Sequence, residues 1–154
     1  MRFEVLRGKK REEILGYLQE EFGVDPDFFS DYCLLRSGNR IWLASRDICE
    51  KGRPESFPAE AVGLSFLRIG KGLKLTTSGA QFLGPRIKKR LMDVGEDELA
   101  RLLSGLDLRG EGEGYVVFRF RGDVIGIGRF VDGRVKNMIP KSRRIPLKEL
   151  SGGT

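Results

Sequence analysis

The last third of the chain contains three apolar-rich segments separated by short turns, and this spacing restricts the possible folds more than any other feature. Residues 115–121 and 124–130 are predicted strands that meet at the turn 121–123. A second turn, residues 131–133, leads to a third predicted strand at residues 134–139. Both turns contain glycine and aspartate, which tolerate the backbone conformations that short turns require. The pattern predicts three closely spaced strands in this part of the chain.

A helix is predicted directly before these strands. Its first turn, residues 96–98, is acidic, and the helix dipole favours negative charge at that end. Its apolar face consists of Leu99, Leu102 and Leu103, and Gly105 can end it.

Upstream segments also alternate between helix and strand patterns. The spacing of the apolar residues predicts a helix over residues 10–22, with Gly23 as its C-cap. Further predicted elements are a hairpin of residues 32–36 and 40–44, a short helix capped by Ser45, strands at 61–69 and 73–76, a helix capped by Thr77 or Ser78, and a strand at 91–94. Residues 1–9 have no clear pattern, and residues 109–114 are predicted to form a loop.

These elements predict an α+β fold with two domains divided at Gly95. The expected boundaries are 1–94 for the first domain, 95–150 for the second and 151–154 for a tail. A hydrophobic fraction of 40% is sufficient for packed cores. We expect a soluble cytoplasmic protein, because no apolar run approaches the roughly 20 residues of a membrane-spanning helix and the N-terminus lacks a signal-peptide core.

The chain contains no histidine, which excludes Ser–His and Cys–His nucleophiles and histidine metal ligands. We therefore expect no metal, no cofactor and no catalytic centre. Cys33 and Cys49 are predicted to be reduced thiols in preference to a disulfide, as is usual in the cytosol. The few Gln and Asn residues, together with 32% charged residues, are typical of heat-adapted proteins.

Charge is distributed unevenly in the last third of the chain. Residues 95–118 contain six acids and two bases, whereas residues 119–148 contain nine bases and only two acids. A concentrated positive segment attracts polyanions such as RNA. Arg can donate two hydrogen bonds to one phosphate, and Asn137 could contact a base edge or a ribose hydroxyl.

Each of these features also has a structural interpretation. Arg119 and Arg121 can simply lie on a solvent face. Tyr115 and Phe130 could stack on bases if exposed, but aromatic residues at strand positions more often belong to a core. Gly126 and Gly128 are predicted to mark a bulge or a close approach of the backbone. A second basic patch of Arg86, Lys88, Lys89 and Arg90 either extends the RNA surface or is a solvated helix end.

Residues 115–145 resemble a PUA domain, an RNA-binding module named after pseudouridine synthases and archaeosine transglycosylases. The resemblance is carried by residues 114–117, 124–128 and 133–140, and residues 98–105 are similar to the first helix of that domain. The segment of residues 136–140, Lys-Asn-Met-Ile-Pro, is especially similar to the C-terminal appendage of Sun/Fmu-type RNA cytosine methyltransferases.

Residues 41–94 resemble the pre-PUA domain of the ribosome-biogenesis factor called nip seven, which occurs in archaea and eukaryotes. The similar segments are residues 41–44, 62–70 and 74–78. The two resemblances imply a pre-PUA-like mixed α/β domain followed by a PUA-like β pseudobarrel.

In such families the basic end of the PUA domain contacts RNA. With two arginines from the basic segment added, the predicted RNA-binding residues are Arg129, Arg134, Lys136, Asn137, Lys141, Arg143, Arg144 and Lys148. The expected function is non-catalytic binding of structured rRNA or tRNA during ribosome biogenesis or RNA modification. The expected partners are RNA and possible assembly factors or an RNA methyltransferase. The alternative is an accessory protein-interaction subunit of such a complex, which an exposed apolar patch within residues 10–35 would favour.

Overall fold

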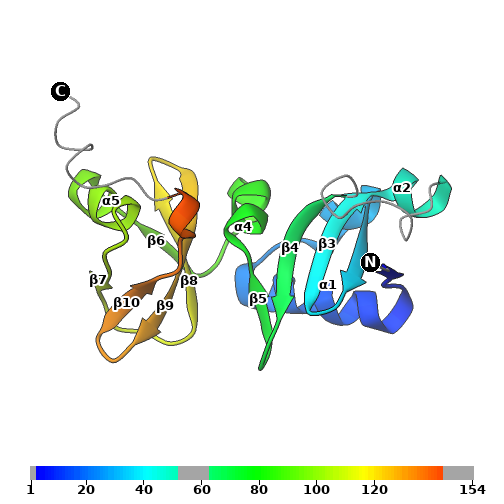
Figure 1. Ribbon diagram of the computed structural model, residues 1–154, viewed down its shortest axis with the longest axis horizontal. Coiled ribbons are helices and arrows are strands. Elements are labelled where there is room, and N and C mark those ends of the chain that lie inside the picture. The colour runs from blue at the N-terminus through cyan, green and yellow to red at the C-terminus, as the bar shows by residue number, and fades with distance from the viewer. Residues whose placement is uncertain (1–2, 52–62, 144–154) are drawn as a thin grey trace. The chain divides into compact units, whose positions relative to one another are not determined.

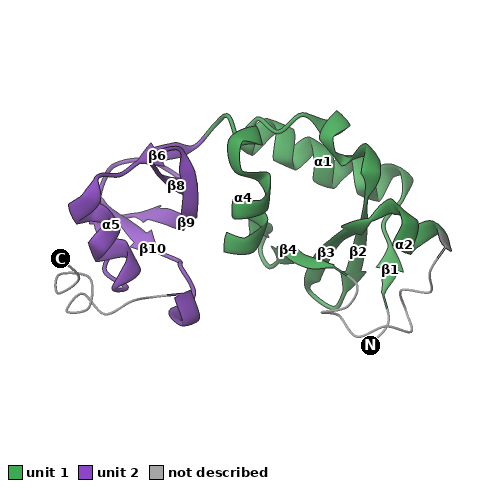
Figure 2. Ribbon diagram, turned by 90° about the horizontal axis from the view of Figure 1, so that it is seen from above, with its two compact units in different colours: residues 1–89 green, residues 90–154 purple. Residues whose placement is uncertain are grey.

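The computed structural model describes residues 3–51 and 63–143 (Figure 1). The chain forms two compact units, residues 1–89 and 90–154 (Figure 2). This division precedes the expected boundary at Gly95, because the strand at residues 91–93 pairs within the second unit. In the part of the chain that the structure describes, no helix is long and apolar enough to cross a membrane.

The first unit is built on a five-stranded sheet in the order β1-β2-β3-β4-β5, and every neighbouring pair is antiparallel. The strands are β1 (Glu4–Val5), β2 (Tyr32–Ser37), β3 (Arg40–Ser45), β4 (Leu64–Ile69) and β5 (Leu73–Leu75). The predicted hairpin is therefore present as β2 and β3, whose turn contains Gly38 at φ 61°. The short strand β1 lies in a segment without a recognisable pattern.

The long helix α1 (Gly8–Phe22) belongs to the same unit as this sheet (Figure 1). Its buried residues Ile14, Leu18 and Phe22 recur at a spacing of four, which places them on one face. Gly23 ends the helix in the left-handed region at φ 69°, as the sequence predicted. The hydroxyl of Tyr17 donates a 3.0 Å hydrogen bond to the carbonyl of Leu73, which ties α1 to β5.

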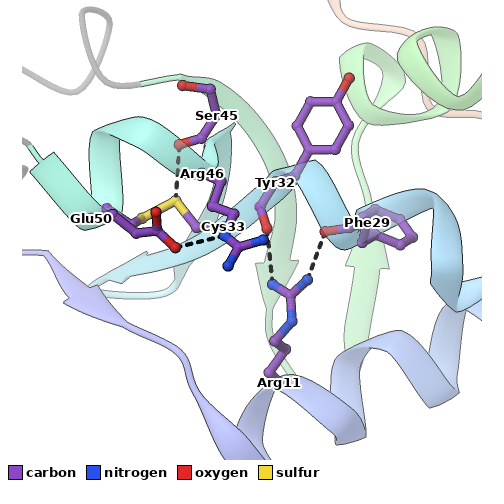
Figure 3. Close-up of a disulfide and its surroundings, with 8 residues drawn as sticks. Arg11, Phe29, Tyr32, Cys33, Ser45, Arg46 and Glu50 are labelled. Atoms are coloured by element: carbon purple, nitrogen blue, oxygen red, sulfur yellow. Dashed lines mark hydrogen bonds and ion pairs between the residues drawn. A yellow bond between two sulfur atoms is a disulfide. The ribbon is translucent and has the colours of Figure 1, made fainter.

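The opposite face of β2 and β3 carries a small core that includes a disulfide (Figure 3). Cys33 on β2 and Cys49 on helix α2 (Arg46–Lys51) are bonded to each other, so the predicted free thiols were wrong. The chain turns back from β3 into α2 and brings the two Cα atoms to 6.4 Å, within the range that a disulfide requires. Spacing along the sequence could not show this approach.

Helix α4 (Thr77–Leu83) follows β5 and is capped by Thr76 instead of the predicted Thr77 or Ser78. The Thr76 side chain accepts a 2.9 Å hydrogen bond from the amide of Gly79. The helix ends before Gly84 and Pro85, and a 3-10 turn, η3 (Gly84–Arg86), follows. Another 3-10 helix, η1 (Pro26–Asp31), lies between α1 and β2.

The second unit contains a five-stranded sheet in the order β6-β8-β9-β10-β7. Its strands are β6 (Leu91–Asp93), β7 (Leu108–Arg109), β8 (Tyr115–Phe120), β9 (Asp123–Val131) and β10 (Arg134–Asn137). Strand β6 runs parallel to β8 and the other pairs are antiparallel. The three closely spaced strands are confirmed, although β10 ends at Asn137 and β7 occupies the start of the predicted loop.

Helix α5 (Glu96–Leu103) packs against one face of this curled sheet (Figure 2). Leu102 of the helix joins a core made by alternate strand residues, namely Leu108, Val116, Phe118 and Val135, with Val94 and Ile139. The carboxylate of Glu98 accepts a 3.0 Å hydrogen bond from the amide of Gly95 and so caps the acidic first turn. The unit is thus a mixed α/β structure with a half-barrel sheet.

Candidate nucleic-acid interface

The register of the second sheet brings basic side chains together on the face opposite α5. Arg129 on β9 is paired directly with Lys136 on β10, and Arg134 on β10 is paired with Arg109 on β7. Directly opposed residues in antiparallel strands project to the same side of a sheet. Arg134 and Lys136 are two residues apart on one strand, so all four side chains share one face.

We call this set (Arg109, Arg129, Arg134 and Lys136) the cationic sheet face, and all four residues are exposed. Among the described residues, Arg134 is the only member with an ion pair, at 3.5 Å from the carboxylate of Asp107. The other three cations have no acidic partner within that part of the chain. Such a group can neutralise several neighbouring phosphates.

Tyr115 extends the same row on β8, because it is paired directly with Arg129. The guanidinium of Arg129 lies 5.8 Å from the centre of the half-buried Tyr115 ring, within the range of a cation–π contact. At the edge of this row, Arg90 donates a 2.9 Å hydrogen bond to the carbonyl of Glu113. The sheet therefore presents one aromatic ring beside its cations.

Arg119 and Arg121 both form ion pairs with acidic side chains of the same unit. Arg119 donates two hydrogen bonds of 2.6 and 3.0 Å to the carboxylate of Asp93, and Arg121 lies 2.7 Å from Glu96. The hydrogen bond from Arg119 holds the pKa of Asp93 below its ordinary value, and the same contact raises the pKa of Arg119. These pairs lower the positive potential at this end of β8.

The structure gives Asn137 a structural role in place of the predicted contact with RNA. Its side chain is buried and donates hydrogen bonds to the carbonyls of Leu102, at 2.7 Å, and Leu106, at 3.1 Å. Its side-chain oxygen accepts a 2.9 Å hydrogen bond from the amide of Ile139. Neighbouring residues on a strand face opposite ways, so Lys136 is exposed while Asn137 joins β10 to the end of α5.

The basic residues after β10 are separate from the sheet. Lys141 and Arg143 are exposed on a short 3-10 turn, η4 (Lys141–Arg143), which begins after Pro140. The strand register therefore does not bring them into the cationic sheet face. Arg144 and Lys148 lie outside the described residues.

Glycines allow tight packing in this unit, as predicted for a close approach of the backbone. A Cβ atom on Gly126 would overlap the Ile139 side chain, and one on Gly128 would overlap the Phe118 ring. A Cβ on Gly112 would come within 2.9 Å of several Phe130 ring atoms, so the glycine-rich loop lies against that ring. Phe130 packs against the core and is covered by this loop, which leaves Tyr115 as the aromatic member of the basic row.

The second basic patch is divided between the two units. Arg86, Lys88 and Lys89 are exposed residues of the first unit, whereas Arg90 belongs to the second. Lys89 donates a 3.1 Å hydrogen bond from Nζ to the carbonyl of Glu20 near the end of α1, and Lys88 does so to Pro85 at 3.0 Å. Part of this patch therefore stabilises helix and turn ends.

Arg109 belongs to the cationic sheet face but was not among the predicted RNA-binding residues. It was missed because the sequence from residue 109 to 114 reads as a loop, and a loop has no predictable face. Its pairing with Arg134 is the only feature that identifies its orientation.

In the described residues, no group of three His, Cys, Asp or Glu side chains is placed to hold a metal ion.

The curled half-barrel sheet and its helix are consistent with a PUA-like domain, and the comparison of sequences agrees. Residues 89–145 match the family model described as the methyltransferase RsmF PUA domain. The predicted resemblance to the PUA appendage of RNA cytosine methyltransferases is confirmed.

Curated relatives carry the name ribosomal RNA small subunit methyltransferase F. The protein from Aeromonas hydrophila is 29% identical over 150 residues, which cover 90% of this chain and 29% of the relative. The proteins from Aeromonas salmonicida and Vibrio atlanticus are each 27% identical, over 150 and 118 residues. The chain thus spans less than a third of these relatives.

The similarity to the first relative covers 90% of the chain, so it includes residues from both compact units. The relatives and the family model concern methyltransferases, and the pre-PUA arrangement expected for the first unit stays a prediction.

Proposed function

We propose that the chain is a non-catalytic RNA-binding module that contacts structured ribosomal or transfer RNA through the cationic sheet face. The observation that carries the proposal is the row of Tyr115, Arg129 and Lys136, which are neighbours in the strand register on one face of the sheet. Phosphate contacts from the cations supply most of the affinity, and the shape of the RNA supplies the preference.

The names of the relatives favour ribosomal RNA of the small subunit as the ligand. In this proposal the module holds RNA for a methyltransferase domain, which acts on the same RNA in cis or in trans. The arginines and lysines of the module supply position and affinity. We propose no catalytic role for them, because the chain has no histidine to act as a general base near neutral pH. The residues proposed to contact RNA are Arg109, Arg129, Arg134 and Lys136, with Lys141, Arg143, Arg144 and Lys148 as further basic residues of the same domain.

The test compares two double variants that remove the same charge. Arg129→Ala/Lys136→Ala removes two cations from the cationic sheet face, and Arg119→Ala/Arg121→Ala removes two cations that are already paired with acids. Affinity for a small-subunit rRNA hairpin is measured at several salt concentrations. Each lost phosphate contact flattens the log–log salt slope by roughly 0.7 to 0.9, so the first variant flattens it by about 1.5.

The second variant is expected to change the slope much less. Equal effects of the two variants would show that net charge alone determines binding, and the proposed face would be abandoned. If the wild-type chain does not bind RNA even at low salt, the RNA-binding function itself is wrong.

A further inference from the structure

Three aromatic rings meet at the surface of the first unit. Phe28 of η1 lies 5.4 Å from Tyr32 of β2 and 5.9 Å from Phe82 of α4, measured between ring centres, and Tyr32 and Phe82 are 5.5 Å apart. Phe82 is 38% exposed, and the other two rings are half-buried. We call these three residues the aromatic cluster.

The backbone beneath the cluster is held by hydrogen bonds from α1. The guanidinium of Arg11 donates to the carbonyl of Phe29 at 2.7 Å and to the carbonyl of Tyr32 at 3.1 Å. Figure 3 shows the ring of Tyr32 extending away from this guanidinium. Phe29 is fully buried and packs against Phe66 of the sheet. The positions of Phe28 and Tyr32 are therefore determined by buried neighbours.

Helix α4 is anchored as firmly on the other side of the cluster. The hydroxyl of Thr76 donates a 2.7 Å hydrogen bond to the carbonyl of Ser65. A Cβ atom on Gly79 would lie 2.7 Å from the carbonyl oxygen of Phe66, so only glycine permits this approach of α4 to β4. Phe82 follows Gly79 by three residues and is thus held in place while staying partly exposed. A preformed ring surface binds a ligand with little loss of conformational entropy.

Cations border the cluster on one side. The guanidinium of Arg86 lies 4.3 Å from the centre of the Phe28 ring, in a stacked cation–π contact. Beside it is a cavity of about 310 Å³ lined by Gly23, Asp25, Phe28, Pro85, Arg86 and Lys88. Residues 82–90 contain four bases and no acid, whereas Asp27 and Asp31 belong to η1. Asp25, which caps η1, lines the same cavity as Arg86 and Lys88.

We propose that the aromatic cluster is a stacking site for an unpaired base of a single-stranded RNA segment, with the adjoining phosphates held by Arg86 and Lys88. A ring with an accessible face stacks on any base, and an arginine beside it pairs with the backbone. The asymmetry of charge orients the strand, because the acids of η1 repel phosphate and the basic segment after Phe82 attracts it. The chemistry fits RNA better than an apolar protein surface, since the rings are bordered by exposed cations.

This site deepens the proposed function and rests on it, because it adds a single-strand contact in the first unit to the phosphate-binding face of the second. The test uses one RNA hairpin in two forms, with a blunt end and with a single-stranded 3′ overhang. Wild-type protein is expected to bind the overhang form more tightly. Phe82→Ala is expected to lose about 5- to 100-fold in affinity for the overhang form and to bind the blunt form unchanged.

Phe82→Leu separates stacking from general apolar contact, because it keeps an apolar side chain and removes the ring. We expect it to behave like Phe82→Ala, and Phe82→Tyr to bind like wild type. Leu106→Ala is the matched control, since Leu106 is 40% exposed but stands outside the cluster. Ultraviolet crosslinking of the overhang to a peptide that contains Phe82 gives a second readout that does not depend on affinity.

If wild type binds both hairpins equally, or if Phe82→Leu keeps full affinity for the overhang, the stacking site is wrong while RNA binding by the sheet face stands. If wild type binds neither hairpin, both the proposed function and this site are overturned.

Discussion

At the scale of single residues, adjacent side chains on β10 have opposite roles. Lys136 is exposed on the cationic sheet face, and Asn137 is buried with hydrogen bonds to Leu102, Leu106 and Ile139. Both are polar, and composition alone gives no reason to separate them. The alternation of a strand decides which one meets solvent.

Replacing Asn137 with alanine is expected to lower the free energy of unfolding by about 1–3 kcal/mol, because two carbonyls and one amide lose their partner in a buried site. Chemical denaturation followed by circular dichroism measures the loss. Lys136→Ala is the matched control and should change stability by less than about 0.5 kcal/mol. Equal destabilisation by the two substitutions would contradict the structural role of Asn137.

The ion pair between Asp93 and Arg119 predicts a dependence of stability on pH. Because the pKa of Asp93 is lowered in the folded chain, its stabilising effect is present above the unfolded pKa and is lost as the pH falls through the folded value. Asp93→Asn should therefore be less stable than wild type near pH 7, and the difference should disappear once the pH falls below the lowered pKa of Asp93. Thermal unfolding across this pH range is the measurement, and a constant difference would be inconsistent with the pair.

At the scale of elements, the effect of a glycine depends on what its missing Cβ would meet. Gly126→Ala on β9 forces a methyl group into Ile139 and should destabilise the chain by about 1–3 kcal/mol. Gly16→Ala on α1 meets nothing within 4 Å and should stabilise it by about 0.5–1 kcal/mol. Denaturant midpoints of the two variants should therefore move in opposite directions.

The disulfide joins β2 to α2 across a sequence separation of 16 residues. Removing it with Cys49→Ala should cost up to about 3 kcal/mol, because the unfolded chain regains the freedom of that loop. A reductant should lower the thermal midpoint of wild type and leave that of Cys49→Ala unchanged. Titration of denatured, unreduced protein should find no free thiol, and two free thiols would restore the original prediction.

At the scale of the whole molecule, the absence of histidine predicts that the proposed binding of RNA does not depend on pH near neutrality. Histidine is the side chain whose unperturbed pKa falls in this range, so without it no side chain with an ordinary pKa changes charge between about pH 6 and 7. Dissociation constants measured across this range at constant salt should agree within error. A change of more than about twofold would indicate a carboxyl group with a strongly raised pKa at the interface.

Much of the fold could be predicted from local patterns. Apolar spacing identified α1, glycine placed its end, and the turns at residues 121–123 and 131–133 separated β8, β9 and β10. The short strands β1 and β7 escaped prediction, because two residues cannot show an alternation and their conformation comes from the neighbouring strand. The parallel pairing of β6 with β8 joins segments that are distant in sequence, which periodicity does not report.

The sequence by itself determined the kind of elements, the excess of positive charge after residue 119 and the lack of histidine chemistry, since these depend on local residues and on composition. Only the tertiary structure decided which cations share a face, that Asn137 is buried and that Cys33 meets Cys49. It also brought Phe28, Tyr32 and Phe82 together from η1, β2 and α4. Register and packing bring distant residues into contact, and no local pattern along a single chain contains that information.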